Sequence, residues 1–205
     1  MSQLALPLAW PADPSDDAFL LSPSNEQAVA TLDGWAGWPV RTALLVGPPR
    51  SGRSLLARIF ARRSGAVVMD DAERLPEASL FHAWNRAQAA NRPLLLVADR
   101  APPAWEVTLP DLRSRLAASP LAEIGPPDDA LARALLELEF GRRALDARPD
   151  LVEWLANRLE RSHAVLLDAA ATLDARAMEQ RRRPSIPFAR AILTEAGFLE
   201  SPGEQ

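Results

Sequence analysis

Cysteine and lysine are both absent from this sequence of 205 residues, and histidine occurs only twice. Without cysteine the chain can form neither disulfide bonds nor thiolate metal sites. The two histidines, His82 and His163, are far apart in sequence, which argues against a metal centre built from imidazoles. All 23 basic residues are arginine, and 27 acidic residues give a net charge of −4. This balance provides no general attraction to nucleic acid.

Long hydrophobic runs are also lacking. No apolar stretch approaches the roughly 20 residues that a membrane-spanning helix requires. The first residues, MSQLALPLAWP, lack the basic region of a signal peptide. Hydrophobic residues nevertheless make up 48% of the chain, enough to build the core of one domain or of a domain with a small appendage. We therefore expect a cytoplasmic protein with no membrane partner.

Three kinds of segment follow one another along the chain. Residues 1–24 are rich in Pro, Ser and Asp without a sustained hydrophobic period, so they predict a flexible N-terminal arm. Between residues 25 and 125, buried strands alternate with helices, which predicts an α/β fold with a parallel sheet sandwiched by helices. The expected strands cover 41–47, 66–71, 92–100 and 121–125. Only helical segments follow, so residues 126–205 are predicted to form an all-helical lid subdomain.

The segment LVGPPRSGRSLLARIF contains the spacing of a phosphate-binding loop, from Gly47 to Ser54. Gly47 and Gly52 occupy the glycine positions, and backbone N–H groups of such a loop bind phosphate at the start of the following helix. Arg53 takes the position that lysine has in this motif. A strand-to-helix turn without a ligand is the alternative, but the expected strand before it and helix after it favour a phosphate loop. We predict Gly47, Gly52, Arg53 and Ser54 as nucleotide-binding residues.

Carboxylates follow two of the expected strands. Asp70 and Asp71 end the segment VVMDD, and Asp99 lies in VADR. Ligands of open α/β sheets bind at the carboxyl ends of the strands. We predict that Ser54 and Asp70 hold Mg²⁺, that Asp71 orients or deprotonates an attacking water, and that Asp99 lines the nucleotide site. An acidic strand-to-helix turn is the alternative for these carboxylates.

The arm contains the apolar segment QLALPL, residues 3–8. Its proline favours an extended backbone at the preceding leucine. A glutamine amide and three alternating leucines could lie in a groove on a partner protein. Packing against its own domain is an equal alternative from these residues alone. The predicted partner-binding residues are Gln3, Leu4, Leu6, Pro7 and Leu8.

Together these segments resemble the DnaA-related AAA+ family. VMDDAERL and VADRAP are similar to the Walker B and sensor I segments of the initiator, and LRSRL is similar to its Box VII, which carries an arginine finger. Within this family the chain is similar to the Hda-type regulators. Three features carry that likeness: the clamp-binding-like QLALPL, a phosphate loop that reads GRS where others have GKS, and SIPFARAIL at 185–193.

The resemblance implies a regulatory adaptor that limits replication initiation. It would bind the sliding clamp, the beta subunit of DNA polymerase III, through residues 3–8, and would promote hydrolysis of DnaA-bound ATP. Arg115 is the implied finger and Arg113 the more peripheral residue, whereas the residues alone favour a solvated helix face.

Further partner predictions also follow from the resemblance. The partners of the protein would be the clamp, DnaA and a second copy of the chain. Sequence-specific DNA binding is not expected, because the chain stops where the initiator's helix-turn-helix domain would begin. Two alternatives are a stand-alone P-loop ATPase and a DnaA-family loader or anti-initiator that acts without the clamp.

Three departures from the family pattern predict a weakened nucleotide site. Only residues 64–66 separate the loop helix from the next strand, so edge strand 2 is expected to be missing. Ala164 stands where the family has its sensor II arginine, and Arg161 lies one turn earlier. Arg53 is larger and planar where lysine is a compact point charge. We expect ADP or ATP with Mg²⁺ to bind weakly or not at all, and the chain to be a poor ATPase.

Overall fold

A parallel sheet of four strands forms the centre of the N-terminal part of the chain. The computed structural model describes residues 19–200. The strands are β1 (Thr42–Val46), β2 (Val67–Met69), β3 (Leu94–Ala98) and β4 (Leu121–Glu123). Their order in the sheet is β2-β3-β1-β4, and every pair is parallel. The predicted α/β fold is confirmed.

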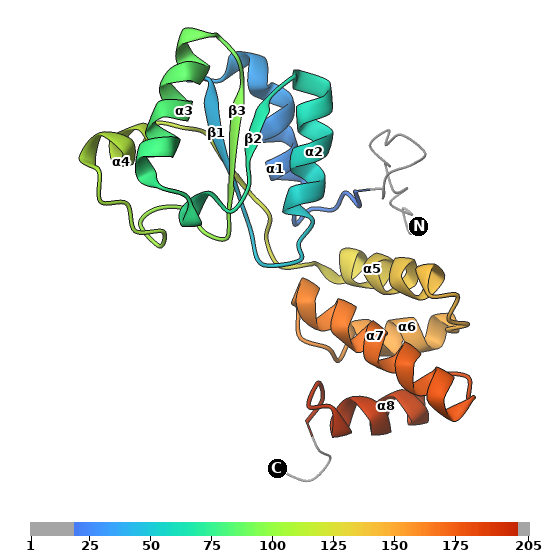
Figure 1. Ribbon diagram of the computed structural model, residues 1–205. Coiled ribbons are helices and arrows are strands. Elements are labelled where there is room, and N and C mark those ends of the chain that lie inside the picture. Colours follow the sequence, from blue (N-terminus) through green and yellow to red (C-terminus); the bar gives the residue numbers. More distant parts are fainter. Residues whose placement is uncertain (1–18, 201–205) are drawn as a thin grey trace. The chain divides into compact units, whose positions relative to one another are not determined.

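Helices cover both faces of this sheet, with α1 and α2 on one side and α3 and α4 on the other (Figure 1). Along β1, Ala43 and Leu45 pack in the first layer while Leu44 and Val46 pack in the second. Because both faces are buried, β1 and β3 are continuous apolar runs. The helices are α1 (Glu26–Asp33), η1 (Gly34–Gly37), α2 (Arg53–Ser64), η2 (Ala72–Arg74), α3 (Glu77–Ala89) and α4 (Pro110–Ala117).

The strand expected to be missing between α2 and the Walker B segment is absent from the described residues. α2 ends at Ser64, and β2 begins only three residues later at Val67. Among residues 19–200, β2 pairs with β3 alone and is therefore an edge of the sheet. Its Val67 side chain is 41% exposed, as expected where no further strand follows.

Residues 19–24 do not belong to a flexible arm, so the predicted arm of residues 1–24 is too long at its C-terminal end. Phe19 is 4% exposed and packs in the core shared with α1 and α2. The Asn25 amide donates a hydrogen bond to the Leu20 carbonyl (2.8 Å) and its oxygen accepts one from the Ser22 backbone N–H (2.9 Å). The segment QLALPL lies outside the described residues.

The second compact unit begins at Pro126 and has a hydrophobic core of its own. Its helices are α5 (Asp129–Arg142), α6 (Pro149–Ala156), α7 (His163–Gln180) and α8 (Ile186–Glu195). The Asp128 side chain caps α5 by accepting a hydrogen bond from the Leu131 N–H (2.8 Å). Within residues 19–200, no helix combines the length and apolar character needed to cross a membrane.

His163, the first residue of α7, is 2% exposed, and burial lowers the pKa of its imidazole. The folded chain therefore keeps His163 neutral at pH values where the unfolded chain, with a pKa of about 6.5, takes up a proton. This contribution to stability is complete above about pH 6.5 and is lost as the pH falls towards the lowered folded pKa.

We predict that lowering the pH from 7.5 to 5.5 reduces the free energy of unfolding of the wild-type chain more than that of His163→Leu. Urea denaturation followed by circular dichroism at the two pH values measures the difference. His82→Leu is the matched control, because His82 is exposed on α3 and its loss should leave the wild-type pH dependence intact. An equal loss of stability in His163→Leu and wild type would contradict the role assigned to His163.

Candidate functional site

The loop from Gly47 to Ser54 joins β1 to α2 and has the backbone geometry of an anion site. A Cβ added to Gly47 would lie 2.9 Å from the Ile124 carbonyl oxygen, so no larger residue fits without movement. Gly52 precedes the first residue of α2 in the left-handed conformation, with φ of 86°. The Ser51 hydroxyl is buried without a hydrogen-bond partner among the described residues. These features fit a phosphate group at the N-terminus of α2.

Ser54 and Asp70 are brought together as the Mg²⁺ prediction requires. The Ser54 hydroxyl donates a hydrogen bond of 2.7 Å to one carboxylate oxygen of Asp70. The other Asp70 oxygen accepts a hydrogen bond of 3.0 Å from the Asp71 backbone N–H. Asp71 itself has a left-handed backbone, with φ of 49°, and directly precedes η2. Hydroxyl and carboxylate oxygens are the ligands that Mg²⁺ prefers, so this pair fits the ion.

Arg53, at the lysine position of the motif, forms an ion pair with Asp99 at the end of β3. The Arg53 side chain is 13% exposed and that of Asp99 is 36% exposed. Arg74 of η2 lies 3.9 Å from the other Asp99 oxygen and 3.8 Å from Asp71. The Glu73 carboxylate accepts a hydrogen bond from the Asp99 backbone N–H (3.0 Å). Asp99 thus lies beside the loop, but its carboxylate competes with a phosphate for the Arg53 guanidinium.

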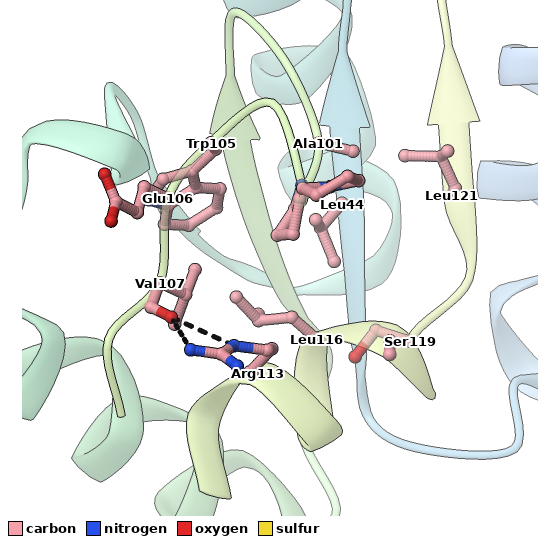
Figure 2. A pocket seen from close by; sticks show the side chains of 12 residues that line it. Leu44, Ala101, Trp105, Glu106, Val107, Arg113, Leu116, Ser119 and Leu121 are labelled. Carbon is pink, nitrogen blue, oxygen red and sulfur yellow. Dashed lines mark hydrogen bonds between the residues drawn. The ribbon is translucent and has the colours of Figure 1, made fainter. Parts of the chain in front are cut away.

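The two arginines of α4 contact different partners. Arg113 donates two hydrogen bonds to the Val107 carbonyl, from Nε at 3.0 Å and Nη2 at 2.6 Å (Figure 2). It lines a pocket of about 510 Å³ whose walls are largely apolar. The Arg115 guanidinium instead lies over two aromatic rings of α3, those of Phe81 and Trp84. The two side chains thus point to different sides of α4, as expected for residues two positions apart on a helix.

The segment before α4 is fastened to α3 by Glu77. The Glu77 carboxylate accepts hydrogen bonds from the backbone N–H groups of Thr108 (2.7 Å) and Leu109 (2.8 Å) and from the Thr108 hydroxyl. These backbone hydrogen bonds, that of Thr108 first, lower the pKa of Glu77. α4 is therefore attached to α3 by groups other than Arg115.

In the helical unit, the position predicted to correspond to sensor II carries an alanine. Ala164 is the second residue of α7. Arg161, one turn earlier, forms an ion pair of 2.5 Å with Asp129 at the start of α5. Its guanidinium is thus engaged by a carboxylate of its own unit, so a missing phosphate contact at this position stays the prediction.

Sequence reasoning missed several groups of this site. Glu73 and Arg74 were not predicted as site residues, although both lie in the segment VMDDAERL. The α3 residues that contact Arg115 were not predicted either. The spacing of Phe81, Trp84 and Asn85, at i, i+3 and i+4 of one helix, was an available signal, because such residues share a helix face.

Comparisons with known proteins agree with this geometry. Residues 129–193 match the family model described as Hda, lid domain. An uncharacterised protein of Haemophilus influenzae is 32% identical over 118 residues, which is 57% of this chain and 51% of that protein. The chromosomal replication initiator protein DnaA of Cutibacterium acnes is 27% identical over 134 residues, 63% of this chain and 27% of that protein. The chain thus spans about half and about a quarter of these relatives.

Solved structures share the fold. Domain III of the Thermotoga maritima replication initiation protein DnaA aligns with a TM-score of 0.68 at 13% identity, covering 88% of this chain and 95% of that chain. AMPPCP-bound DnaA from Aquifex aeolicus aligns with a TM-score of 0.61 at 13% identity, covering 78% and 65%. The Thermotoga maritima RuvB Holliday junction branch migration motor aligns with a TM-score of 0.63 at 16% identity, covering 84% and 68%.

The parallel sheet, its phosphate-type loop and the helical C-terminal unit have an AAA+-type fold, as in DnaA domain III and RuvB. Residues 129–193 match the Hda lid family, and the chain is similar in sequence to a DnaA initiator and in fold to DnaA domain III.

We predict that Asp99→Asn tightens the binding of Mg–ADP. The substitution removes the carboxylate that engages Arg53, so the guanidinium becomes available to a phosphate. Since hydrogen bonds to charged groups contribute about 1.5–3 kcal/mol, the dissociation constant should fall roughly tenfold or more. Calorimetric titration of nucleotide-free protein measures the change.

The control is Asp146→Asn, which breaks an arginine–carboxylate contact with Arg183 in the helical unit. Its affinity for Mg–ADP should equal that of the wild type. Unchanged or weaker binding in Asp99→Asn would show that the ion pair does not limit the nucleotide site.

Proposed function

We propose that this protein is a regulatory adaptor that promotes hydrolysis of the ATP bound to DnaA and thereby limits replication initiation. Residues 3–8 bind the DNA polymerase sliding clamp, which brings the AAA+ body to DnaA on DNA. α4 then presents Arg115 to the nucleotide of DnaA. One observation carries the proposal. Arg115 is half-buried, and no carboxylate among the described residues neutralises its positive charge. In contrast, Arg53 in the chain's own loop is paired with Asp99.

The arginine acts on charge that develops during phosphoryl transfer. A guanidinium supplied by a neighbouring molecule stabilises the transition state of P-loop enzymes, where it contributes about 10³–10⁵ in rate. Arginine suits this role because its planar fork stays charged and can contact two phosphate oxygens. The chain's own loop need not hydrolyse anything for this to work.

The chain's own nucleotide site has a structural role in this proposal. Gly47, Gly52 and Ser54 would hold the phosphates of ADP or ATP, with Ser54 and Asp70 on Mg²⁺. A bound nucleotide would supply negative charge that ties the loop to the start of α2. The Arg53–Asp99 pair would reduce the affinity, and Asp71, just before η2, would orient a water.

One observation favours a second candidate, a stand-alone P-loop ATPase. The Ser54–Asp70 contact of 2.7 Å preserves the expected magnesium ligands. Steady turnover of ATP by the purified chain without DnaA or clamp would support that candidate.

We predict that Arg115→Ala lowers the rate at which ATP–DnaA is converted to ADP–DnaA by roughly a hundredfold or more. The reaction contains DNA-loaded clamp, and the nucleotide on DnaA is separated by chromatography. Arg113→Ala is the matched control on the same helix, and it should retain most of the activity because the guanidinium of Arg113 donates its hydrogen bonds to the Val107 carbonyl of its own chain. Wild-type conversion by Arg115→Ala would refute the finger, and loss in Arg113→Ala alone would assign it to the other arginine.

We predict that the double substitution Leu6→Ala/Leu8→Ala weakens clamp binding by well over tenfold. Burial of one leucine side chain is worth roughly 1.5–3 kcal/mol, and two anchors are lost. Calorimetry with purified clamp gives the affinity, and Ala5→Ser provides a control within the same segment. An unchanged affinity of the double variant would exclude residues 3–8 as the clamp-binding segment.

A further inference from the structure

Three residues on one face of α3 surround the predicted finger. Phe81, Trp84 and Asn85 stand at i, i+3 and i+4, so their side chains project from the same side of the helix. The Arg115 guanidinium carbon lies 4.2 Å from the Phe81 ring centroid and 4.5 Å from that of Trp84. Arg115 Nη1 also donates a hydrogen bond to the Asn85 side-chain oxygen.

We infer that Phe81, Trp84 and Asn85 form a cradle that positions Arg115 for action on a nucleotide bound by a partner protein. The three are positioning residues, since each acts through Arg115. The inference rests on the proposed function of Arg115 and extends it to α3, which carries no motif of its own.

The chemistry of the cradle explains why it suits a residue that must act elsewhere. Aromatic faces attract a guanidinium through the ring quadrupole, and an amide oxygen accepts one of its N–H groups. None of these groups carries a formal negative charge, so the positive charge of Arg115 is not cancelled. Arg53 shows the contrast, because its partner is the carboxylate of Asp99. No ion pair of Arg115 occurs within residues 19–200.

Fixing the Arg115 side chain before the partner binds also favours catalysis. A free arginine side chain loses rotamer freedom when it is fixed at a phosphate, and that loss weakens binding in the transition state. The two rings and the amide restrict the Arg115 side chain in the unbound chain. Among residues 19–200 only its Nη1 atom forms a hydrogen bond, to Asn85, which leaves Nε and Nη2 for a bidentate contact.

A purely structural role for the cradle would be to fasten α4 to α3. That attachment is already made by other groups. Leu80 of α3 and Leu112 and Leu116 of α4 are buried in one core cluster, and Glu77 bonds the backbone of Thr108 and Leu109. Substitution of a ring should therefore leave α4 in place and alter only the freedom of Arg115.

The experiment compares Trp84→Phe with Trp84→Leu in the conversion of ATP–DnaA on DNA-loaded clamp. Both variants fill part of the space of the indole, but only phenylalanine retains an aromatic face. The indole N–H of Trp84 is buried with no partner among the described residues, so phenylalanine leaves no other group unsatisfied. Single-turnover rates are measured as a function of adaptor concentration, together with the melting temperature and the clamp affinity.

The expected result is a rate at saturating adaptor that falls about threefold to tenfold in Trp84→Leu and stays within about twofold in Trp84→Phe. The concentration giving half of that rate should not change, because docking is unaffected. Phe81→Leu and Phe81→Tyr should behave as a second pair of the same kind. In NMR spectra, the Hε signal of Arg115, identified with Arg115→Lys, should lose its ring-current shift in Phe81→Leu/Trp84→Leu.

Equal saturating rates for wild type, Trp84→Leu and Phe81→Leu would overturn the cradle. Equal losses in the leucine and aromatic variants of each pair would also overturn it, by showing that packing volume alone matters. Both outcomes leave the proposed function intact as long as wild type is active and Arg115→Ala is not. A wild-type chain that fails to convert ATP–DnaA would instead refute the proposed function and the inference with it.

Discussion

The ion pair between Arg53 and Asp99 is the interaction on which the organisation of the loop depends. It joins the first residue of α2 to the residue that follows β3, and Arg74 brings η2 into the same network. The backbone of the loop has a geometry that fits an anion, and the Ser54 hydroxyl bonds Asp70. The charge differs from that of an ordinary phosphate loop, because the Asp99 carboxylate lies against the Arg53 guanidinium that should bind a phosphate. A loop with this backbone geometry, whose Arg53 guanidinium is engaged by a carboxylate, predicts a nucleotide site that is weak rather than lost.

Two arginines of the α/β unit therefore differ in the partners of their guanidinium groups, and we assign them different roles. Arg53 is largely buried and paired with a carboxylate, while Arg115 is held by two rings and an amide that leave its charge in place. In the proposed function, the arginine at position 53 is a structural cation, and the arginine at position 115 is a cation available to a partner. The proposed function requires this division, because it has the chain lend catalytic charge to a partner instead of turning over its own nucleotide.

Local patterns predicted much of the fold and part of the site. Leu44, Leu45 and their neighbours form continuous apolar runs because helices cover both faces of the sheet, so the strands and their parallel arrangement were visible in the sequence. The glycine spacing and the strand ends likewise predicted that Ser54 and Asp70 would meet. Arg53 and Asp99 are 46 residues apart, and no local pattern reveals that these two predicted site residues pair with each other. Phe19 was missed for a similar reason, since its burial depends on the core formed by α1 and α2.

The central claim is that hydrolysis occurs on DnaA and that this chain provides only the arginine. The most direct test locates the hydrolysed nucleotide by disabling each protein in turn, in mixtures with DNA-loaded clamp and with phosphate release as the readout. The account predicts near wild-type release when this chain carries Asp71→Asn, and none when DnaA is a variant unable to hydrolyse its ATP. Release that is lost with Asp71→Asn and persists with the disabled DnaA would contradict it.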